Sequence, residues 1–506
     1  MSLLFACTLG SLLLFSLLYA IGGVIHRLYF SPLSKFPGPK LAAATLWYEF
    51  YYDVVLKGQY TFKIKSLHQK YGPIVRISPY ELHISDPEFY GTLYSHSSPR
   101  DKCAYYVKPF DFPQSSFGTI DARLHRLRRG AINPFFSRGK VLKQESLIQE
   151  LVLKFCKRVE NFGKPGAVIP LSLGFTCLIT DLITSYVMGR SYHYIDQPDW
   201  HPHWGQTLRD ASEFGMLARQ VTWVLPILKS IPQVWAEALN PGLCLFFTLT
   251  RRTQDRISET QKERDSMEKG ELRFEKKQTL IDQVLDSKLA AEEKSSERLA
   301  QEIRSAIGAG TETTSNALTV TMFHVFSNPE TLRRLQRELQ ELEPDLDAVT
   351  NLCDLEKLPY LSSCILEGLR LSYGVSTRLQ RKSNTAIQYK EFSIPPGTAV
   401  GMTSVLQHHD EHIFPNSHDF LPERWLDPVE RKRLDKYLVT FSKGSRRCIG
   451  MNLAQAAMYT TVAELVRRFD MELHGTTRDD IDVKHDLFIP RPKNLKTLGL
   501  QVKLKR

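Results

Sequence analysis

The chain has 506 residues, of which 42% are apolar and 24% charged, and this composition excludes a mostly disordered chain and a collagen. A mean hydropathy of −0.26 excludes a transporter with many membrane spans. The net charge of +11 fits a nucleic acid, an anionic membrane surface or an acidic protein as partner, without choosing among them. Its eight cysteines form no Cys-x-x-Cys pair, so neither a disulfide framework nor a zinc ribbon is indicated.

The first strong feature is an apolar stretch at the N-terminus. Residues Leu3 to Ile25 carry no charge, and a helix of this length would span about 34 Å, enough for a hydrocarbon core of about 30 Å. Positive charges follow at Arg27, Lys35 and Lys40, which predicts that the rest of the chain lies in the cytosol. We interpret residues 1–26 as a transmembrane signal anchor, with a cleaved signal peptide and a buried core helix as alternatives.

A proline-rich segment follows this stretch. Pro32, Pro37 and Pro39 fix backbone angles and remove amide donors, so this stretch cannot be helical. We expect residues 27–41 to form a stiff spacer and residues 42–506 to form the globular catalytic body.

Helical periodicity dominates the body, and a short β-hairpin interrupts it near its start. Its strands would be residues 74–77 and 82–84, around a Ser-Pro-Tyr turn. Further along, the pattern predicts a basic helix over 121–131, exposed helix or mobile loop over 251–300, an apolar helix over 299–327, two helices within 331–373, a turn at 394–398 and a last helix over 453–468. No long linker divides the body, so we predict one large, mainly α domain with a small β subdomain.

The segment with the strongest chemical signal surrounds Cys448. Residues 441–450 read Phe-Ser-Lys-Gly-Ser-Arg-Arg-Cys-Ile-Gly. Gly444 and Gly450 would permit positive φ and a close backbone approach. Loop amides and the N-terminus of the next helix would favour a thiolate, which suits an axial iron ligand. A buried structural cysteine is the alternative.

This loop resembles the haem-binding loop of the cytochrome P-450 family, in which Cys448 would be the iron's proximal ligand. Three further motifs resemble those of the family and follow in its order: Ala309-Gly310-Thr311-Glu312-Thr313, Glu367-Gly368-Leu369-Arg370 and Phe420-Leu421-Pro422-Glu423-Arg424-Trp425. With the apolar N-terminus, the resemblance covers nearly the whole chain. It implies the cytochrome P-450 fold of the microsomal type, with a single haem-binding domain after a transmembrane helix. Residues 48–52 and 125–136 look like those of filamentous-fungal members acting in secondary metabolism.

The resemblance implies a set of residues that hold haem b, the iron protoporphyrin. These are Cys448 with Phe441, Gly444, Arg446 and Gly450 of its loop, and Ala309 and Gly310 of the central helix. Thr313 and Glu312 would be the catalytic pair that delivers protons during oxygen activation. Glycines cost about 1 kcal/mol each inside a helix, and a threonine hydroxyl can bond back to a carbonyl one turn earlier, so this part of the helix is suited to forming a groove.

Two further groups of charged residues have roles by resemblance. Glu367 and Arg370 lie one helical turn apart, and with Arg424 they would form a network that locks the cysteine loop; a solvated ion pair is the alternative. His125 and Arg129 resemble the family's Trp-x-x-x-Arg pair that binds a haem propionate, with His125 in place of the tryptophan. Arg378, eight residues after Arg370, is a second propionate candidate, and a surface charge is the alternative for each arginine.

The function implied by the resemblance is a haem-thiolate monooxygenase in the endoplasmic reticulum membrane, with its catalytic domain in the cytosol. It would insert one oxygen atom from O2 into an apolar small molecule, such as a terpenoid or polyketide intermediate. No nicotinamide or flavin site is visible in the sequence, so electrons would come from NADPH through a membrane-bound flavoprotein reductase, with cytochrome b5 as a further possible donor. A same-fold isomerase or dehydratase that uses a peroxide, a non-catalytic haem sensor and a nucleic-acid binder are the alternatives, and the last lacks a recognition module.

Two surfaces can also be assigned by resemblance. The substrate side would include the apolar residues Phe110, Phe112, Phe117, Phe214, Met216, Val375 and Phe488. The reductase side would be a positive face around the cysteine loop, formed by Lys443, Arg447, Arg126 and Arg128, with Arg446 committed to a haem propionate.

Overall fold

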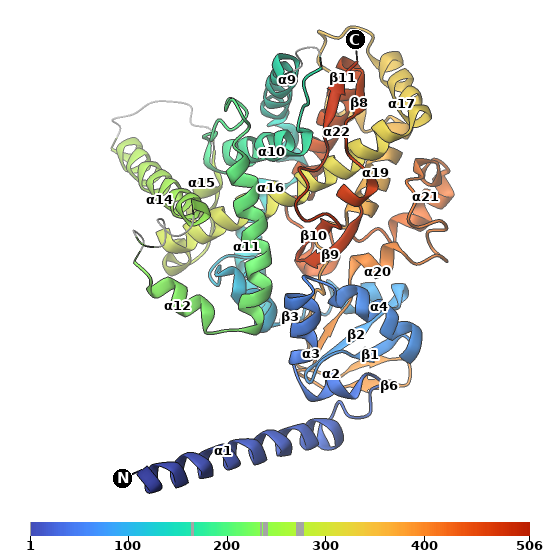
Figure 1. The fold of residues 1–506 in the computed structure, drawn as a ribbon. Coiled ribbons are helices and arrows are strands. Elements are labelled where there is room, and N and C mark those ends of the chain that lie inside the picture. The colour runs from blue at the N-terminus through green and yellow to red at the C-terminus, as the bar shows by residue number, and fades with distance from the viewer. Residues whose placement is uncertain (1, 163–165, 233–234, 236–240, 270–277, 506) are drawn as a thin grey trace.

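Helices make up most of the fold, as predicted. The largest sheet lies at one end of the body, whereas the strands Met471–Leu473 and Val502–Leu504 lie at the opposite end, near the C-terminus (Figure 1). The computed structural model describes residues 2–162, 166–232, 235, 241–269 and 278–505. Its longer helices are α1 (Ser2–Ile25), α4 (Tyr60–Tyr71), α7 (Ala122–Ile132), α9 (Glu145–Phe162), α10 (Leu171–Met188), α11 (Pro202–Gln220), α12 (Val224–Ser230), α14 (Pro241–Glu268), α16 (Ser296–Ser327), α17 (Pro329–Leu342), α19 (Pro359–Ser372), α21 (Pro428–Asp435) and α22 (Met451–Arg468). Shorter helices are α2 (Lys40–Ala44), α3 (Trp47–Phe50), α5 (Tyr90–Leu93), α6 (Ala104–Val107), α8 (Arg138–Leu142), α15 (Leu280–Leu285), α18 (Leu352–Leu355) and α20 (Ser404–His408).

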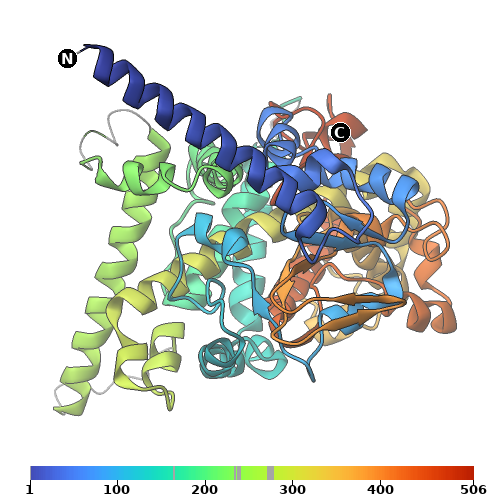
Figure 2. The same cartoon turned by 90° about the horizontal axis from the view of Figure 1, so that it is seen from below.

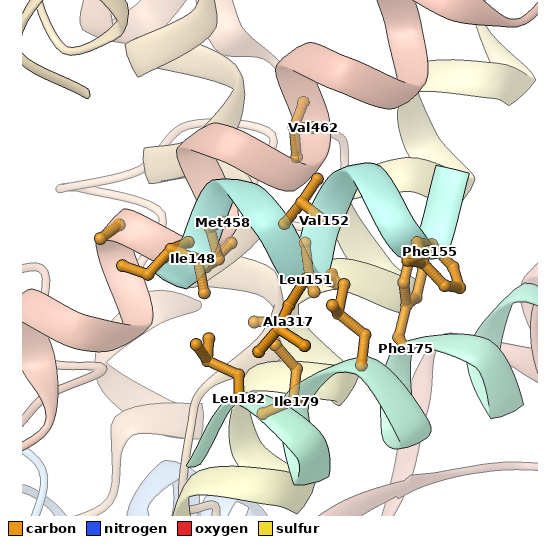
Figure 3. Packing of buried hydrophobic residues seen from close by; sticks show 14 of the residues in the cluster. Ile148, Leu151, Val152, Phe155, Phe175, Ile179, Leu182, Ala317, Met458 and Val462 are labelled. Atoms are coloured by element: carbon orange, nitrogen blue, oxygen red, sulfur yellow. The ribbon is translucent and has the colours of Figure 1, made fainter. Parts of the chain in front are cut away.

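The centre of the core lies where α9, α10, α16 and α22 meet. Figure 3 shows side chains of all four helices packed together, among them Val152, Ile179, Ala317 and Val462. At 1.5 Å per residue, the 32 residues of α16 run for about 48 Å through the molecule. This helix is buried along most of its length, and Ala309 in its middle is exposed between buried turns.

The sheets are small and mostly antiparallel. The largest has the order β1-β2-β7-β4-β3, formed by Ile74–Arg76, Glu81–Ile84, Ala399–Gly401, Arg381–Lys382 and Asp101–Lys102. Only β2 and β7 pair in parallel within it. Three two-stranded sheets join β5 (Ile387–Tyr389) to β6 (Phe392–Ile394), β9 (Val483–Leu487) to β10 (Ile489–Pro492), and β8 (Met471–Leu473) to β11 (Val502–Leu504).

The apolar N-terminal helix projects away from this body (Figures 1 and 2). A window over Cys7–Phe30 is long and apolar enough to cross a membrane, and none of it is buried. The helix α10 passes the same test of length and composition, but 78% of its window is buried, so α10 is a core helix.

The predicted spacer differs from the observed segment. Residues His26–Phe30 continue the first helix as one π-helical turn, and α2 already begins at Lys40. Between them the chain packs on the body: Phe36 is buried, and the Arg76 amide donates to the Pro37 carbonyl at 2.7 Å. An added Cβ at Gly38 would lie 2.3 Å from the Arg76 carbonyl oxygen, so the prolines hold a backbone that is docked against β1.

Most of the other predicted elements are confirmed within the described residues. Two differ: residues 331–373 contain the three helices α17, α18 and α19 where two were predicted, and α15 is largely buried within a stretch predicted to be exposed helix or mobile loop. The hairpin is β1 and β2, the basic helix is α7 with Asp121 as its N-cap, and the Pro-Pro-Gly turn joins β6 to β7. The stretch over 251–300 contains the end of α14, then α15 and the start of α16. Residues 270–277 of that stretch lie outside the described residues.

Candidate functional site

A cavity of about 1250 Å³ lies beside the middle of α16. The cysteine loop and the first turns of α22 line it on one side, and α11 and the turn between β9 and β10 line it on another. The residues predicted for the haem and the substrate meet there: Ala309, Gly310, Glu312, Thr313, Phe441, Arg446, Cys448, Gly450, Phe110, Phe112, Phe117, Phe214, Val375 and Phe488 all line the cavity. Met216, the other predicted substrate contact, is buried and lies outside this lining.

The cysteine loop is held by a tight backbone turn. Gly444 has φ +73°, and an added Cβ would lie 2.3 Å from the Tyr94 carbonyl oxygen, so both expectations for this glycine are confirmed. The Cys448 amide then donates to the Phe441 carbonyl at 2.9 Å. Gly450 differs from the prediction, because it has φ −80° and serves as the N-cap of α22.

Cys448 is accessible from the cavity, and protein atoms enclose its surroundings. Burial raises the pKa of its thiol, while the backbone N–H groups of Gly450 and Met451 and the charges of Arg129 and Arg447 act in the opposite direction. These donors stabilise the anionic sulfur at the start of α22. A cationic metal centre on the cavity side would complete this environment, so the donor set fits a thiolate ligand to iron.

Positive side chains line the cavity next to the cysteine loop. Lys102, Arg381 and Arg446 all belong to the lining. Burial and then the charges of Arg446 and Arg381 lower the pKa of Lys102. Burial and then Arg381 lower the pKa of Arg446 to about 9. Like charges gathered in a buried place destabilise one another, so this cluster fits an anionic ligand such as the two propionates of a haem.

His125 and Arg129 of α7 lie next to this cluster and are not part of the cavity lining. Burial and then Arg446 and Lys102 lower the pKa of His125 to about 2, which keeps its imidazole neutral. Arg129 donates to the Asn133 side chain at 2.6 Å and to the Arg447 carbonyl at 2.8 Å. Arg129 therefore holds the cysteine loop through the Arg447 carbonyl, which differs from the direct propionate contact expected for it.

Arg378 corrects a prediction. Its guanidinium is fully buried away from the cavity, 2.7 Å from Glu49 and 3.5 Å from each of Asp53 and Glu81. Three carboxylates draw this charge toward the N-terminal segment, so it is not available to a propionate. Arg381, three residues later, takes the place in the lining. Neither Arg381 nor Lys102 was predicted, because spacing alone does not tell Arg378 from Arg381.

The central helix carries the predicted threonine in the predicted geometry. The Thr313 hydroxyl donates to the Ala309 carbonyl at 2.8 Å, and α16 continues without a break through this turn. Glu312 faces the same cavity, and its carboxylate accepts hydrogen bonds from Arg491 and Ser212. No feature of the sequence indicated these two partners.

The predicted charge network is present, with Glu367 and Arg370 fully buried and the Arg424 side chain 10% exposed. Arg370 lies 2.8 Å from Glu367, and Arg424 lies 3.1 Å from the same carboxylate. The Trp425 indole also donates to Glu367 at 2.9 Å. Burial raises the pKa of Glu367, but the two arginines outweigh it and hold this pKa below its ordinary value.

Hydrogen bonds connect the network to the segment before the cysteine loop. The Arg370 carbonyl bonds to His408 Nδ1 at 2.8 Å, and the Val439 amide donates to His408 Nε2 at 2.9 Å. One residue later, the Thr440 hydroxyl donates to the Leu369 carbonyl at 2.7 Å. The structure therefore links α19 to residues 439–440, just before the loop begins at Phe441.

Comparisons with known proteins agree with this site. The family model described as Cytochrome P450 matches residues 37–498. The chain is 44% identical to Cytochrome P450 monooxygenase MO6277 of Ascocoryne sarcoides, with 96% of each chain covered. It is 40% identical to Tryptophan 6-hydroxylase fscE of Fusarium equiseti, covering 98% and 97%, and 36% identical to Cytochrome P450 monooxygenase TRI4 of Trichoderma arundinaceum, covering 97% and 94%.

Proposed function

Because this chain belongs to the cytochrome P450 family of monooxygenases, we propose that it inserts one oxygen atom from O2 into an apolar small molecule of fungal secondary metabolism. The observation that carries this proposal is that Cys448, Thr313 and Glu312 line one cavity with the cationic cluster. The fungal source of the relatives supports the metabolic setting, and the hydroxylase named among them supports the reaction type. A terpenoid or polyketide intermediate is the substrate class we propose, because the lining is mostly apolar.

The residues that line the cavity have different proposed roles. Haem, when bound, supplies the iron that activates O2. Cys448 holds that iron, and Lys102, Arg381 and Arg446 hold the propionates. Aromatic rings exclude water from the substrate side. The ring centroids of Phe110 and Phe488 lie 4.4 Å apart, and those of Phe110 and Phe117 lie 5.5 Å apart. Thr313 and Glu312, which line the same cavity, would hold protons there and donate them during oxygen activation.

The alanine variant of Thr313 tests the proton-delivery role. Positioned proton transfer contributes about 10²–10⁴-fold to a rate. We expect Thr313→Ala to bind haem and substrate normally, to form product at least about tenfold more slowly, and to release the missing reducing equivalents as peroxide. Product, peroxide and NADPH are measured together with a reductase, after a panel of terpenoids and polyketides has identified a substrate.

The control for this variant is Thr331→Ser, at a buried threonine on α17 that is not part of the cavity lining. An unchanged ratio of product to NADPH in Thr313→Ala would remove the proton role. It would also favour the same-fold enzyme that rearranges a peroxide.

The exposed N-terminal helix supports a membrane location for the enzyme. We propose that residues 1–26 anchor it in the endoplasmic reticulum, single-pass, with residues 42–506 as the catalytic domain in the cytosol. Arg27, Lys35 and Lys40 on the body side of the helix favour this orientation.

A membrane-bound NADPH-dependent flavoprotein reductase, with cytochrome b5 as a further donor, is the partner we propose. The face of this enzyme that would bind the reductase consists of different residues from those predicted. Arg128 is buried and makes a two-pronged ion pair with Glu293 at 2.7 and 2.9 Å. Arg446 donates to the backbone carbonyls of Thr119 and Ile120, just before α7. Arg123, Arg126 and Arg447 are exposed, and α7 borders the cysteine loop through Arg129.

Charge reversal on α7 tests this face. We expect Arg123→Glu with Arg126→Glu to slow the first electron transfer by about tenfold at low salt, since opposite charges steer an encounter. The parent rate should fall as salt rises, because the Debye length shortens from about 10 Å at 0.1 M to about 3 Å at 1 M. Arg333→Glu on α17 is the matched control, since Arg333 is also exposed but lies on a helix outside the lining. Equal rates for parent and double variant at low salt would place the reductase on another surface.

A further inference from the structure

The carboxylate of Glu312 joins three elements of the fold. One oxygen accepts a hydrogen bond from the Arg491 guanidinium of β10 at 2.5 Å. The other accepts from the Ser212 hydroxyl of α11 at 3.0 Å. The Glu312 and Arg491 side chains are only 12% and 16% exposed. An ionised carboxylate offers about four acceptor sites, so it keeps room for a proton-carrying water on the cavity side.

The hairpin that carries Arg491 is built to hold its position. Pro490 and Pro492 flank Arg491 and restrict the backbone on both sides. The pairing of β9 with β10 shifts register between Arg491 and Pro492, and a β-bulge of this kind changes the direction in which a side chain points. The arginine is therefore presented by a stiff and locally irregular strand.

Hydrogen bonds also fix the turn of the same hairpin. Phe488 has φ +74°, an unfavourable conformation for a residue with a Cβ. Its amide donates to Asp486 at 3.2 Å, and its carbonyl accepts from the Ser376 amide at 3.1 Å. Phe488 and Ile489 line the cavity. One rigid hairpin thus faces the substrate space with its turn and holds the Glu312 carboxylate with its second strand.

We propose that Arg491 is a positioning residue, which with Ser212 fixes the Glu312 carboxylate for proton delivery beside Thr313. The position of this carboxylate then depends on α11 and the hairpin as well as on α16. This inference rests on the role proposed above for Thr313 and Glu312. A contact that only joined the three elements would stabilise the fold but would leave the fate of the electrons unchanged.

The test measures how the enzyme divides electrons when no substrate is added. With a reductase, NADPH + H⁺ + O2 gives NADP⁺ + H2O2, whereas 2 NADPH + 2 H⁺ + O2 gives 2 NADP⁺ + 2 H2O. The ratio of peroxide to NADPH therefore reports proton delivery without any knowledge of the substrate. The variants are Arg491→Gln, Arg491→Lys, Glu312→Gln and the double variant Glu312→Gln with Arg491→Gln.

We expect Arg491→Gln to raise the peroxide share several-fold, as Glu312→Gln does, and the double variant to be no worse than either single one. Arg491→Lys should restore part of the water-forming route, because it returns the charge without the planar fork. Lys493→Gln is the matched control: this lysine directly follows the same strand, is exposed and pairs only with Asp479 among the contacts of the described residues. Its peroxide share should equal that of the parent.

A second readout does not depend on turnover. The melting temperatures of the parent, Arg491→Gln, Glu312→Gln and the double variant show whether the ion pair exists in solution, since a formed pair makes the two single losses non-additive. If the changes in melting temperature are non-additive but Arg491→Gln leaves the peroxide share unchanged, the contact only stabilises the fold. That result would overturn the inference. Thr313→Ala is measured alongside. If it leaves the peroxide share unchanged, the relay itself is wrong; if it raises the share while Arg491→Gln does not, only the inference about Arg491 is wrong.

Discussion

Replacing Cys448 with alanine is expected to abolish both the activity and the strongly red-shifted Soret band of the reduced protein with carbon monoxide. That band requires a thiolate on the iron, because the thiolate donates electron density to it. In the described residues, Cys448 is the only cysteine that lines the cavity, and the Gly450 and Met451 amides face its sulfur. No neighbouring side chain can supply an equivalent anionic sulfur, so the loss should be complete.

The matched control is Cys353→Ala. Cys353 is also an exposed cysteine, but it lies on α18 and outside the cavity lining. We expect it to keep the parent spectrum and activity, as measured by difference spectroscopy on equal amounts of protein. A red-shifted band in Cys448→Ala would show that another residue binds the iron.

The second large effect is expected for Glu367→Gln. The carboxylate is fully buried and faces both Arg370 and Arg424, so its loss leaves two buried charges without their anion. Breaking a buried pair in this way costs about 3–5 kcal/mol of unfolding free energy. Because the network is linked to residues 439–440, we also expect the variant to lose haem. Urea unfolding and the haem retained after gel filtration measure the two effects.

An exposed ion pair of the same chemistry provides the control. Glu430 and Arg433 of α21 lie 2.9 Å apart at i,i+3, with side chains 50% and 42% exposed. We expect Glu430→Gln to change the unfolding free energy by less than about 1 kcal/mol, since water screens an exposed pair. Equal stability losses in Glu367→Gln and Glu430→Gln would contradict the importance of the buried network.

The same network predicts a direction for the effect of pH. The pKa of Glu367 is held below its ordinary value in the folded protein, so the folded state binds this proton less readily than the unfolded chain. Its stabilising contribution is therefore complete above the ordinary glutamate range and is lost as the pH falls through the depressed folded pKa. At neutral pH the contribution should not vary with pH.

Much of the site could be predicted from the sequence, because its functional residues lie together in short segments of the chain. Cys448, Gly444 and Phe441 fall within one loop, and the Cys448 amide bonds back to the Phe441 carbonyl inside it. The positive φ of Gly444 is likewise a local feature that a glycine permits. Thr313 bonds back to Ala309 within one helical turn, as the local pattern predicts. The pairing of Glu367 with Arg370 follows from helical spacing for the same reason.

Contacts between distant parts of the chain could not be predicted in this way. The choice of Arg381 over Arg378, the burial of Arg128 against Glu293 and the docking of Phe36 depend on which segments meet. The sequence by itself predicted a candidate iron ligand, the central helix and the fold class, since these depend on residue types at fixed local spacing. Only the tertiary structure decided which charges face the cavity and that Arg491 holds Glu312 across 179 positions, because an arginine pairs with whichever carboxylate the fold brings within reach.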